Sequence, residues 1–145
     1  MSGQSTADRV AVPFAWPVRV YFEDTDSGGV VYYANYLKFM ERARTEWLRA
    51  RGFEQDRLLE RERLLFVIAA ADVRYRRPAR FNDMLYVTAS MAGHTRASFS
   101  FVQEIYRGST GGELLCQGNV RAVCLHADSR RPRPLPELLL AEITR

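Results

Sequence analysis

One amphipathic segment with marked ends constrains the fold of this chain more than any other feature. Over residues 36–50 apolar side chains recur every three or four positions and charged side chains fill the positions between, which predicts a helix. The apolar positions are Tyr36, Leu37, Met40, Ala43, Trp47 and Leu48. Asn35 suits the N-cap and Gly52 the residue after the helix, and a second, short charged helix is expected over 55–63.

Most of the remaining chain alternates between apolar and polar residues, the pattern of half-buried strands. The expected strands lie at about 18–23, 72–76, 85–91, 99–105 and 114–124, with a terminal helix over 137–143. Turn-forming residues separate them at 78–83, 93–96 and 108–112. Such short connections favour antiparallel neighbours, because parallel strands need crossover helices.

One long helix and about five strands leave few ways to bury the apolar face of the helix. We therefore expect an α+β fold in which a curved antiparallel sheet wraps around one central helix. The 145 residues suit one domain, with residues 1–16 as a loose arm and 17–145 as the folded unit. The sheet would leave an edge strand open, and pairing it with a second copy predicts a homodimer or a homotetramer built as a dimer of dimers.

Composition excludes several functional classes. No apolar run approaches the roughly 20 residues that span a bilayer, and no secretory leader is visible, so a cytoplasmic protein is expected. Cys116 and Cys124 lie too far apart along one strand to form a disulfide and are expected to be buried thiols. The two histidines, His94 and His126, show no metal-ligand spacing, so no metal is expected.

The net charge of +4 comes almost entirely from arginine, and these arginines are scattered along the chain. A scattered pattern disfavours a nucleic-acid partner, because duplex binding gathers basic residues on one element. A basic surface suits a small molecule that carries phosphates, and acyl-coenzyme A is one. No separate cofactor is then expected, since coenzyme A is part of the substrate.

An acidic turn with two glycines, residues 24–29, stands directly before the long helix. A helix N-terminus offers unpaired backbone N–H groups and partial positive charge, which stabilise a carbonyl oxygen that gains negative charge. A carboxylate on the adjacent turn can attack that carbonyl or activate water against it. The arrangement suits acyl transfer. Asp24 is expected to have a structural, hydrogen-bonding role there.

The segment 19–36, RVYFEDTDSGGVVYYANY, resembles the signature of the 4-hydroxybenzoyl-CoA thioesterase family. The matching positions are Arg19-Val20, Thr25-Asp26, Gly29-Val30-Val31, Tyr33 and Tyr36. Over about residues 17–140 the chain looks most like the Tol-Pal-associated acyl-CoA thioesterases, which have the hotdog fold. The resemblance implies hydrolysis of acyl-CoA thioesters to free acid and CoA.

The resemblance also implies roles for particular residues. Asp26 is the expected catalytic carboxylate, either a nucleophile or a general base toward the thioester. Tyr33 is the second expected catalytic residue and lines the site near the helix start, where many Tol-Pal-associated members have His instead. The backbone N–H groups at the helix start, those of Ala34, Asn35 and Tyr36, polarise the thioester carbonyl.

Candidates for binding the coenzyme A phosphates are arginines, which grip phosphate oxygens bidentately. Arg74, Arg76 and Arg96 are the chosen candidates, and exposure to solvent is the alternative for each. A second functional hypothesis is a non-catalytic module that binds acyl carrier protein or lipid-synthesis enzymes of the cell envelope. A hotdog dehydratase is disfavoured, because no histidine occurs between Asp26 and Arg51. The acyl chain preference, and the choice between nucleophile and base, stay open at this point.

Overall fold

The computed structural model describes residues 14–144, so most of the expected N-terminal arm lies outside the described residues. Residues 14–16 of that arm are not loose, because they begin the first strand. In chain order the elements are β1 (Phe14–Arg19), the 3₁₀ helix η1 (Phe22–Asp24), α2 (Asn35–Ala50), α3 (Gln55–Glu62), β2 (Leu64–Tyr75), β3 (Met84–His94), β4 (Ser98–Arg107), β5 (Glu113–His126) and α4 (Glu137–Ile143).

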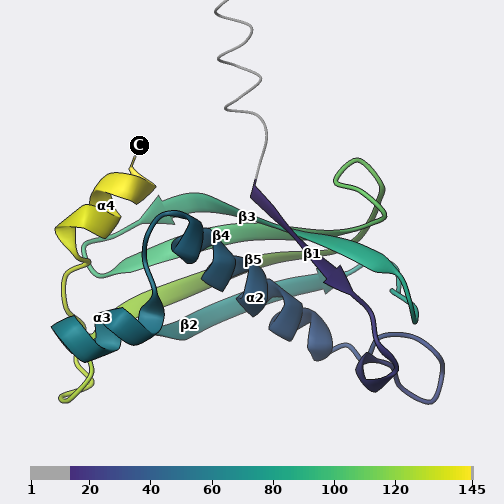
Figure 1. Cartoon of the computed structure of the whole chain (residues 1–145), viewed down its shortest axis with the longest axis horizontal. Coiled ribbons are helices and arrows are strands. Elements are labelled where there is room, and N and C mark those ends of the chain that lie inside the picture. The colour runs from purple at the N-terminus through teal and green to yellow at the C-terminus, as the bar shows by residue number, and fades with distance from the viewer. Residues whose placement is uncertain (1–13, 145) are drawn as a thin grey trace, which may run out of the picture.

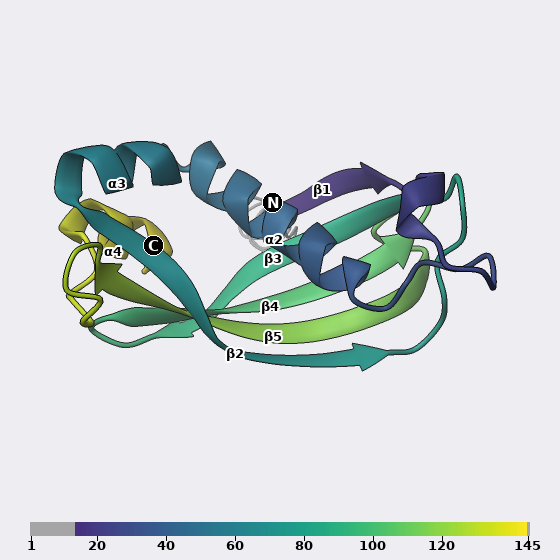
Figure 2. The ribbon, with the colours of Figure 1, turned by 90° about the horizontal axis from the view of Figure 1, so that it is seen from below.

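The five strands form one antiparallel sheet in the order β1-β3-β4-β5-β2. The sheet is curved, and α2 runs along its concave side (Figure 1, Figure 2). The predicted α+β hotdog architecture is thereby confirmed. The segment that carries the acidic turn enters α2 at one end of the sheet, whereas α3 and α4 lie at the other end.

The buried face of α2 forms the centre of the core. Its buried residues are Tyr36, Phe39, Met40, Ala43, Trp47 and Leu48. Leu37, which we expected on this face, is 42% exposed, and Phe39 takes its place because it lies one turn before Ala43 on the buried stripe. The Trp47 ring meets the Phe101 ring of β4 edge-on, with centroids 5.1 Å apart. This packing fixes α2 against the sheet.

Two strands differ from the sequence expectation. The first strand ends at Arg19 and not at Glu23, because the chain turns into η1, whose last residue, Asp24, accepts the N–H of Tyr21 with its carboxylate at 2.8 Å. Strand β2 begins at Leu64, well before the alternating part, and its register shifts between Ile68 and Ala70. A continuous apolar run has no period of two, so alternation alone missed its first half.

Cys116 and Cys124 are both free and buried, as predicted. Between residues 14 and 144, no helix is long and apolar enough to span a bilayer.

Candidate active site

The acidic turn folds into a tight loop that leaves the Asp26 carboxylate exposed. The Asp26 N–H donates to the Val30 carbonyl at 2.9 Å, and Gly29, with a φ of +83°, returns its N–H to the Asp26 carbonyl at 3.1 Å. One carboxylate oxygen of Asp26 accepts the N–H of Gly28 at 2.8 Å. Within residues 14–144 no cation forms an ion pair with Asp26. The local backbone therefore orients a carboxylate that is open to a ligand.

Asp24 has the structural role expected of it. Besides its carboxylate bond to Tyr21, its carbonyl oxygen accepts the N–H of Tyr32 and the side-chain amide of Asn35, both at 2.9 Å. Asn35 is the first residue of α2. Asp24 therefore joins the loop that carries Asp26 to the start of the helix.

The helix start differs from the expectation in two ways. Ala34 is the N-cap residue, and the Asn35 side chain bonds Asp24 instead of capping. The N–H groups of Asn35 and Tyr36 are already engaged, because they donate to the carbonyls of Tyr32 and Tyr33 at 2.9 and 3.4 Å. In the described part of the chain, no acceptor is present for the N–H of Tyr33 or Ala34. The free amides are therefore those of Tyr33 and Ala34. Of the three amides that we expected to be free, only that of Ala34 is.

An aromatic cavity of about 250 Å³ opens beside this helix start. It is lined by Val31, Tyr33, Tyr36, Tyr75, Arg76, Arg77 and Pro78. Tyr33 is 61% exposed and meets the Tyr75 ring edge-on, with centroids 6.1 Å apart. Asp26 is not among the lining residues. Within a single chain its carboxylate therefore lies outside this cavity, on the loop that leads to the cavity.

Tyr36 serves both as core and as cavity wall. Burial raises the pKa of its phenol, and its hydroxyl oxygen accepts the N–H of Ala79 at 2.9 Å. Tyr75, at the end of β2, was missed by the sequence reasoning. The alternation around it placed it on an inner sheet face, but only the pairing of Tyr75 with Cys116 brings it under Tyr36.

Of the three candidate arginines, Arg74 and Arg76 lie together and Arg96 lies apart. Arg76 lines the aromatic cavity, and its Nε donates to Gln117 at 2.6 Å. Arg74 and Arg76 both line a second, polar cavity of about 240 Å³, together with Asp72 and Glu104. Arg96 lies in the β3–β4 turn, beside the start of α4 and at the far end of the sheet from the acidic loop (Figure 2). Arg77 joins Arg76 at the aromatic cavity.

Metal ligands do not gather within residues 14–144, where no group of three or more His, Cys, Asp or Glu side chains could hold an ion. The buried Cys116 thiol is a poor nucleophile, because burial raises its pKa to about 12. Asp26 therefore stays the candidate carboxylate, exposed on the loop that Asp24 joins to the start of α2.

Comparison with known proteins identifies the family. A model of the thioesterase-like superfamily matches residues 20–143. The acyl-CoA thioester hydrolase YbgC of Escherichia coli O157:H7 is 44% identical over 129 residues, which cover 89% of this chain and 94% of that protein. The acyl-CoA thioesterase YbgC of Haemophilus influenzae is 40% identical over 86% of this chain and 89% of its own length.

Solved structures agree with these matches. The probable thioesterase from Bartonella henselae superposes with a TM-score of 0.80 at 34% identity, covering 86% of this chain and all of that one. Slr0204, a 1,4-dihydroxy-2-naphthoyl-CoA thioesterase from Synechocystis, shares the fold with a TM-score of 0.84 at 24% identity, covering 92% of this chain and 96% of that one. With sequence and fold in agreement, the chain belongs to the thioesterase-like superfamily.

Proposed function

We propose that this protein hydrolyses acyl-CoA thioesters to the free acid and CoA, with the Asp26 carboxylate as the reacting group. The relatives named as acyl-CoA thioester hydrolases match it over nearly their whole length. The observation that carries the role of Asp26 is its exposed carboxylate on a loop that Asp24 joins to the start of α2.

The free amides beside this loop supply the second requirement of thioester hydrolysis. The N–H groups of Tyr33 and Ala34 donate to the thioester oxygen, which gains negative charge as the carbonyl carbon is attacked. These donors are backbone groups in a fixed turn, so they need no rearrangement during the reaction. The thiolate of CoA is already a good leaving group, so the reaction needs no metal.

Two routes fit this arrangement. Asp26 attacks the carbonyl carbon, CoA leaves as the thiolate, and water then hydrolyses the resulting anhydride to regenerate the carboxylate. In the other route Asp26 takes a proton from water, whose oxygen attacks the carbonyl carbon, and the proton ends on the departing thiolate. In ¹⁸O-labelled water, label in the Asp26 carboxylate identifies the first route with water attacking the Asp26 carbon of the anhydride, because in the second route no bond forms between the water oxygen and Asp26.

The aromatic cavity is the proposed site for the acyl group, and its rim for the CoA phosphates. Apolar rings of Tyr33, Tyr36 and Tyr75 form its walls, while Arg76 and Arg77 supply positive charge at its edge. In one chain its volume of about 250 Å³ accommodates a short or aromatic acyl group.

A second copy of the chain completes the site in this proposal. Among residues 14–144 no further strand pairs with either edge of the sheet, but β1 is short and contains Pro17, a residue that blunts an edge. Strand β2 is 12 residues long and exposes Ile68 and Tyr75 by 49% and 46%. Antiparallel pairing of two β2 strands covers these side chains and closes the open side of the aromatic cavity. A monomeric mass by light scattering at micromolar concentration would contradict this.

The decisive experiment compares Asp26→Asn with the wild type. Loss of the carboxylate should lower kcat by about 100-fold or more, because general acid–base or nucleophilic groups contribute on that scale. Asp128→Asn is the matched control, since Asp128 is an exposed aspartate whose partner is Arg63. Near-wild-type turnover by a folded Asp26→Asn variant would remove Asp26 from the mechanism.

A substrate screen tests the activity itself. Short aliphatic, long aliphatic and aromatic acyl-CoAs, together with the same groups on acyl carrier protein, should give the fastest turnover for a short or aromatic acyl-CoA. Negligible turnover on all of them, with retention of the carrier protein in a pull-down, would favour a binding module. The cytoplasmic location and the Tol-Pal association stay predictions.

A further inference from the structure

The loop between β2 and β3, residues 77–83, supports both halves of the proposed active site. The Ala79 N–H donates to the hydroxyl oxygen of Tyr36 in α2 at 2.9 Å. The Ala79 carbonyl accepts the N–H of Val31, in the segment that carries Asp26, at 2.8 Å. Val30 and Arg80 form a β-bridge beside this contact. The position of Ala79 therefore sets the position of the acidic loop relative to the helix.

The same loop packs on the segment that precedes the acidic turn. The Phe81 ring stacks on the Phe22 ring with centroids 3.8 Å apart, and the N–H of Asn82 donates to the Val20 carbonyl at 2.9 Å. Asn82 has a φ of +70°, so the loop turns sharply there. No helix or strand includes residues 77–83, and their shape depends on contacts from outside.

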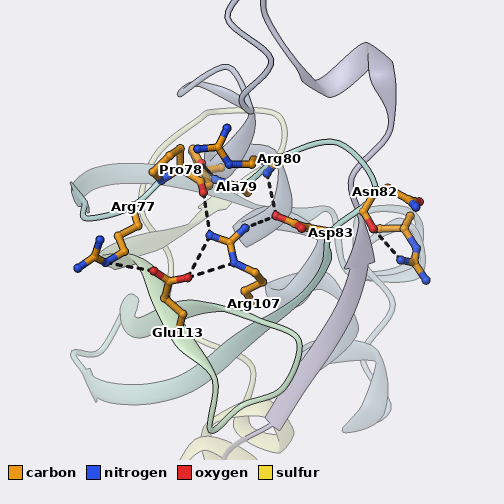
Figure 3. A network of polar contacts seen from close by, with 10 residues as sticks. Arg77, Pro78, Ala79, Arg80, Asn82, Asp83, Arg107 and Glu113 are labelled. Atoms are coloured by element: carbon orange, nitrogen blue, oxygen red, sulfur yellow. Dashed lines mark hydrogen bonds and ion pairs between the residues drawn. The ribbon is translucent and has the colours of Figure 1, made fainter.

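One arginine at the end of β4 adds two side-chain contacts to this loop (Figure 3). The Arg107 guanidinium pairs with the Asp83 carboxylate through Nη1 and donates from Nη2 to the Pro78 carbonyl at 3.1 Å. Asp83 in turn accepts the N–H of Arg80 at 2.8 Å. Arg107 thus holds the loop near both of its ends, on either side of Ala79.

Arg107 is itself oriented by the β4–β5 hairpin. Its Nε donates to Glu113 at 3.2 Å, and the other Glu113 oxygen lies 3.1 Å from Nε of Arg77. Gly112 lets the hairpin approach so closely that a Cβ there would lie 2.1 Å from the Arg107 carbonyl oxygen. The Arg107 and Asp83 side chains are only 28% and 21% exposed, so water screens their attraction less than that of a surface pair.

We propose that Arg107 is a positioning residue for the thioesterase reaction, which fixes the 77–83 loop and through Ala79 sets the Asp26 segment against the start of α2. A guanidinium suits this role because its planar fork binds a carboxylate and a carbonyl at once, which a lysine ammonium does not reproduce. Arg107 is not a lining residue of the aromatic cavity, and its contact with the lining residue Pro78 is to the backbone carbonyl. Its effect on the reaction passes through the backbone of the loop.

The kinetic test compares Arg107→Ala and Arg107→Lys with the wild type on one acyl-CoA. Small displacements of reacting groups cost up to about 100-fold in rate, so kcat should fall about 10- to 100-fold in Arg107→Ala and less in Arg107→Lys. Arg63→Ala is the matched control, because Arg63 also pairs with an aspartate, Asp128, but at the α3 end of the sheet. Its kcat should stay within twofold of wild type.

A purely structural role predicts a different result. In that case Arg107→Ala lowers the melting temperature and leaves kcat per folded molecule unchanged, which would overturn the proposal. Asp83→Asn should weaken the same Arg107–Asp83 contact. The double variant with Arg107→Ala should therefore lose much less kcat than the product of the two single losses. If Arg107→Ala does not fold, wild-type kcat in Arg107→Lys overturns the proposal equally.

The kinetic test of this inference rests on the proposed function. Amide hydrogen exchange tests the positioning role of Arg107 separately from that function. The Val31 amide should exchange at least about tenfold faster in Arg107→Ala or Arg107→Lys than in Arg63→Ala, because its acceptor is the Ala79 carbonyl. Equal Val31 exchange rates in the Arg107 variants and in Arg63→Ala overturn the positioning role of Arg107, whatever the activity. A wild type without thioesterase activity, but with faster Val31 exchange in the Arg107 variants, would contradict the proposed function and leave the positioning of the loop by Arg107 intact.

Discussion

Gln103, which is fully buried in β4, donates from Nε2 to the backbone carbonyl of Met40 in α2 at 3.0 Å. The same amide group donates to the Thr88 carbonyl of β3 at 3.2 Å, and its oxygen accepts Nη1 of Arg44 at 2.9 Å. One buried polar side chain thus connects the central helix to the sheet and gives the half-buried Arg44 a partner.

Gln103→Leu should lower the free energy of unfolding by about 1–3 kcal/mol, because it leaves the half-buried Arg44 guanidinium without the Gln103 acceptor and removes the buried amide's bonds to Met40 and Thr88. Urea unfolding followed by circular dichroism measures the change. Adding Arg44→Met should recover part of the loss, since it removes the unpaired charge. A Gln103→Leu protein as stable as the wild type would show that the amide network contributes nothing net.

Tyr36→Phe should also destabilise the protein, by about 1–3 kcal/mol, because the Ala79 N–H is buried and loses its acceptor. Tyr32→Phe is the control, since the Tyr32 side chain is exposed and its substitution should change stability by less than about 0.5 kcal/mol. Equal unfolding midpoints in urea for both variants would show that the Tyr36 hydroxyl does not hold the 77–83 loop.

Most of the helices and strands were predictable, because the spacing of apolar residues along each of them shows its type. The stripe on α2 and the alternation in β3, β4 and β5 follow directly from the spacing of apolar residues, and the short connections imply antiparallel order. The first half of β2 was missed because every residue from Leu64 to Ala71 is apolar, so no alternation exists to read. The 3₁₀ helix after Tyr21 was missed for two reasons. The alternation typical of a strand continues into it, and its cap is a side-chain contact that the alternation does not show.

The candidate site was predictable only where it lies in one stretch of sequence. Asp26 and Tyr33 belong to the acidic turn and its continuation, so a local motif identifies both. Tyr75 and Arg107 enter the region through strand register, Tyr75 opposite Cys116 and Arg107 opposite Leu85. Residues so distant along the chain leave no spacing for a sequence pattern to detect.

The buried thiol of Cys116 should make stability depend on alkaline pH. Burial raises its pKa from about 9 to about 12, so between these values the unfolded chain loses the proton and the folded one keeps it. Stability is therefore complete below pH 9 and falls as the pH rises toward 12, by about 1 kcal/mol at pH 10. Urea unfolding at pH 8 and pH 10 should show a smaller loss in Cys116→Ala. Equal losses in both proteins would exclude this thiol as the cause.

Tyr33 should matter through its ring and its backbone, and not through its hydroxyl. Its N–H is one of the two free amides and is kept in Phe and Ala variants, while the ring forms a wall of the aromatic cavity. Tyr33→Phe should therefore keep kcat and KM within about threefold of wild type. Tyr33→Ala should raise KM about tenfold with little change in kcat, since the lost apolar contact of roughly 1.4 kcal/mol acts on binding of the acyl group. Steady-state kinetics on an aromatic acyl-CoA measure both constants. A 100-fold fall of kcat in Tyr33→Phe would instead place the phenol in the chemistry, as a proton donor that the Asp26 route does not require.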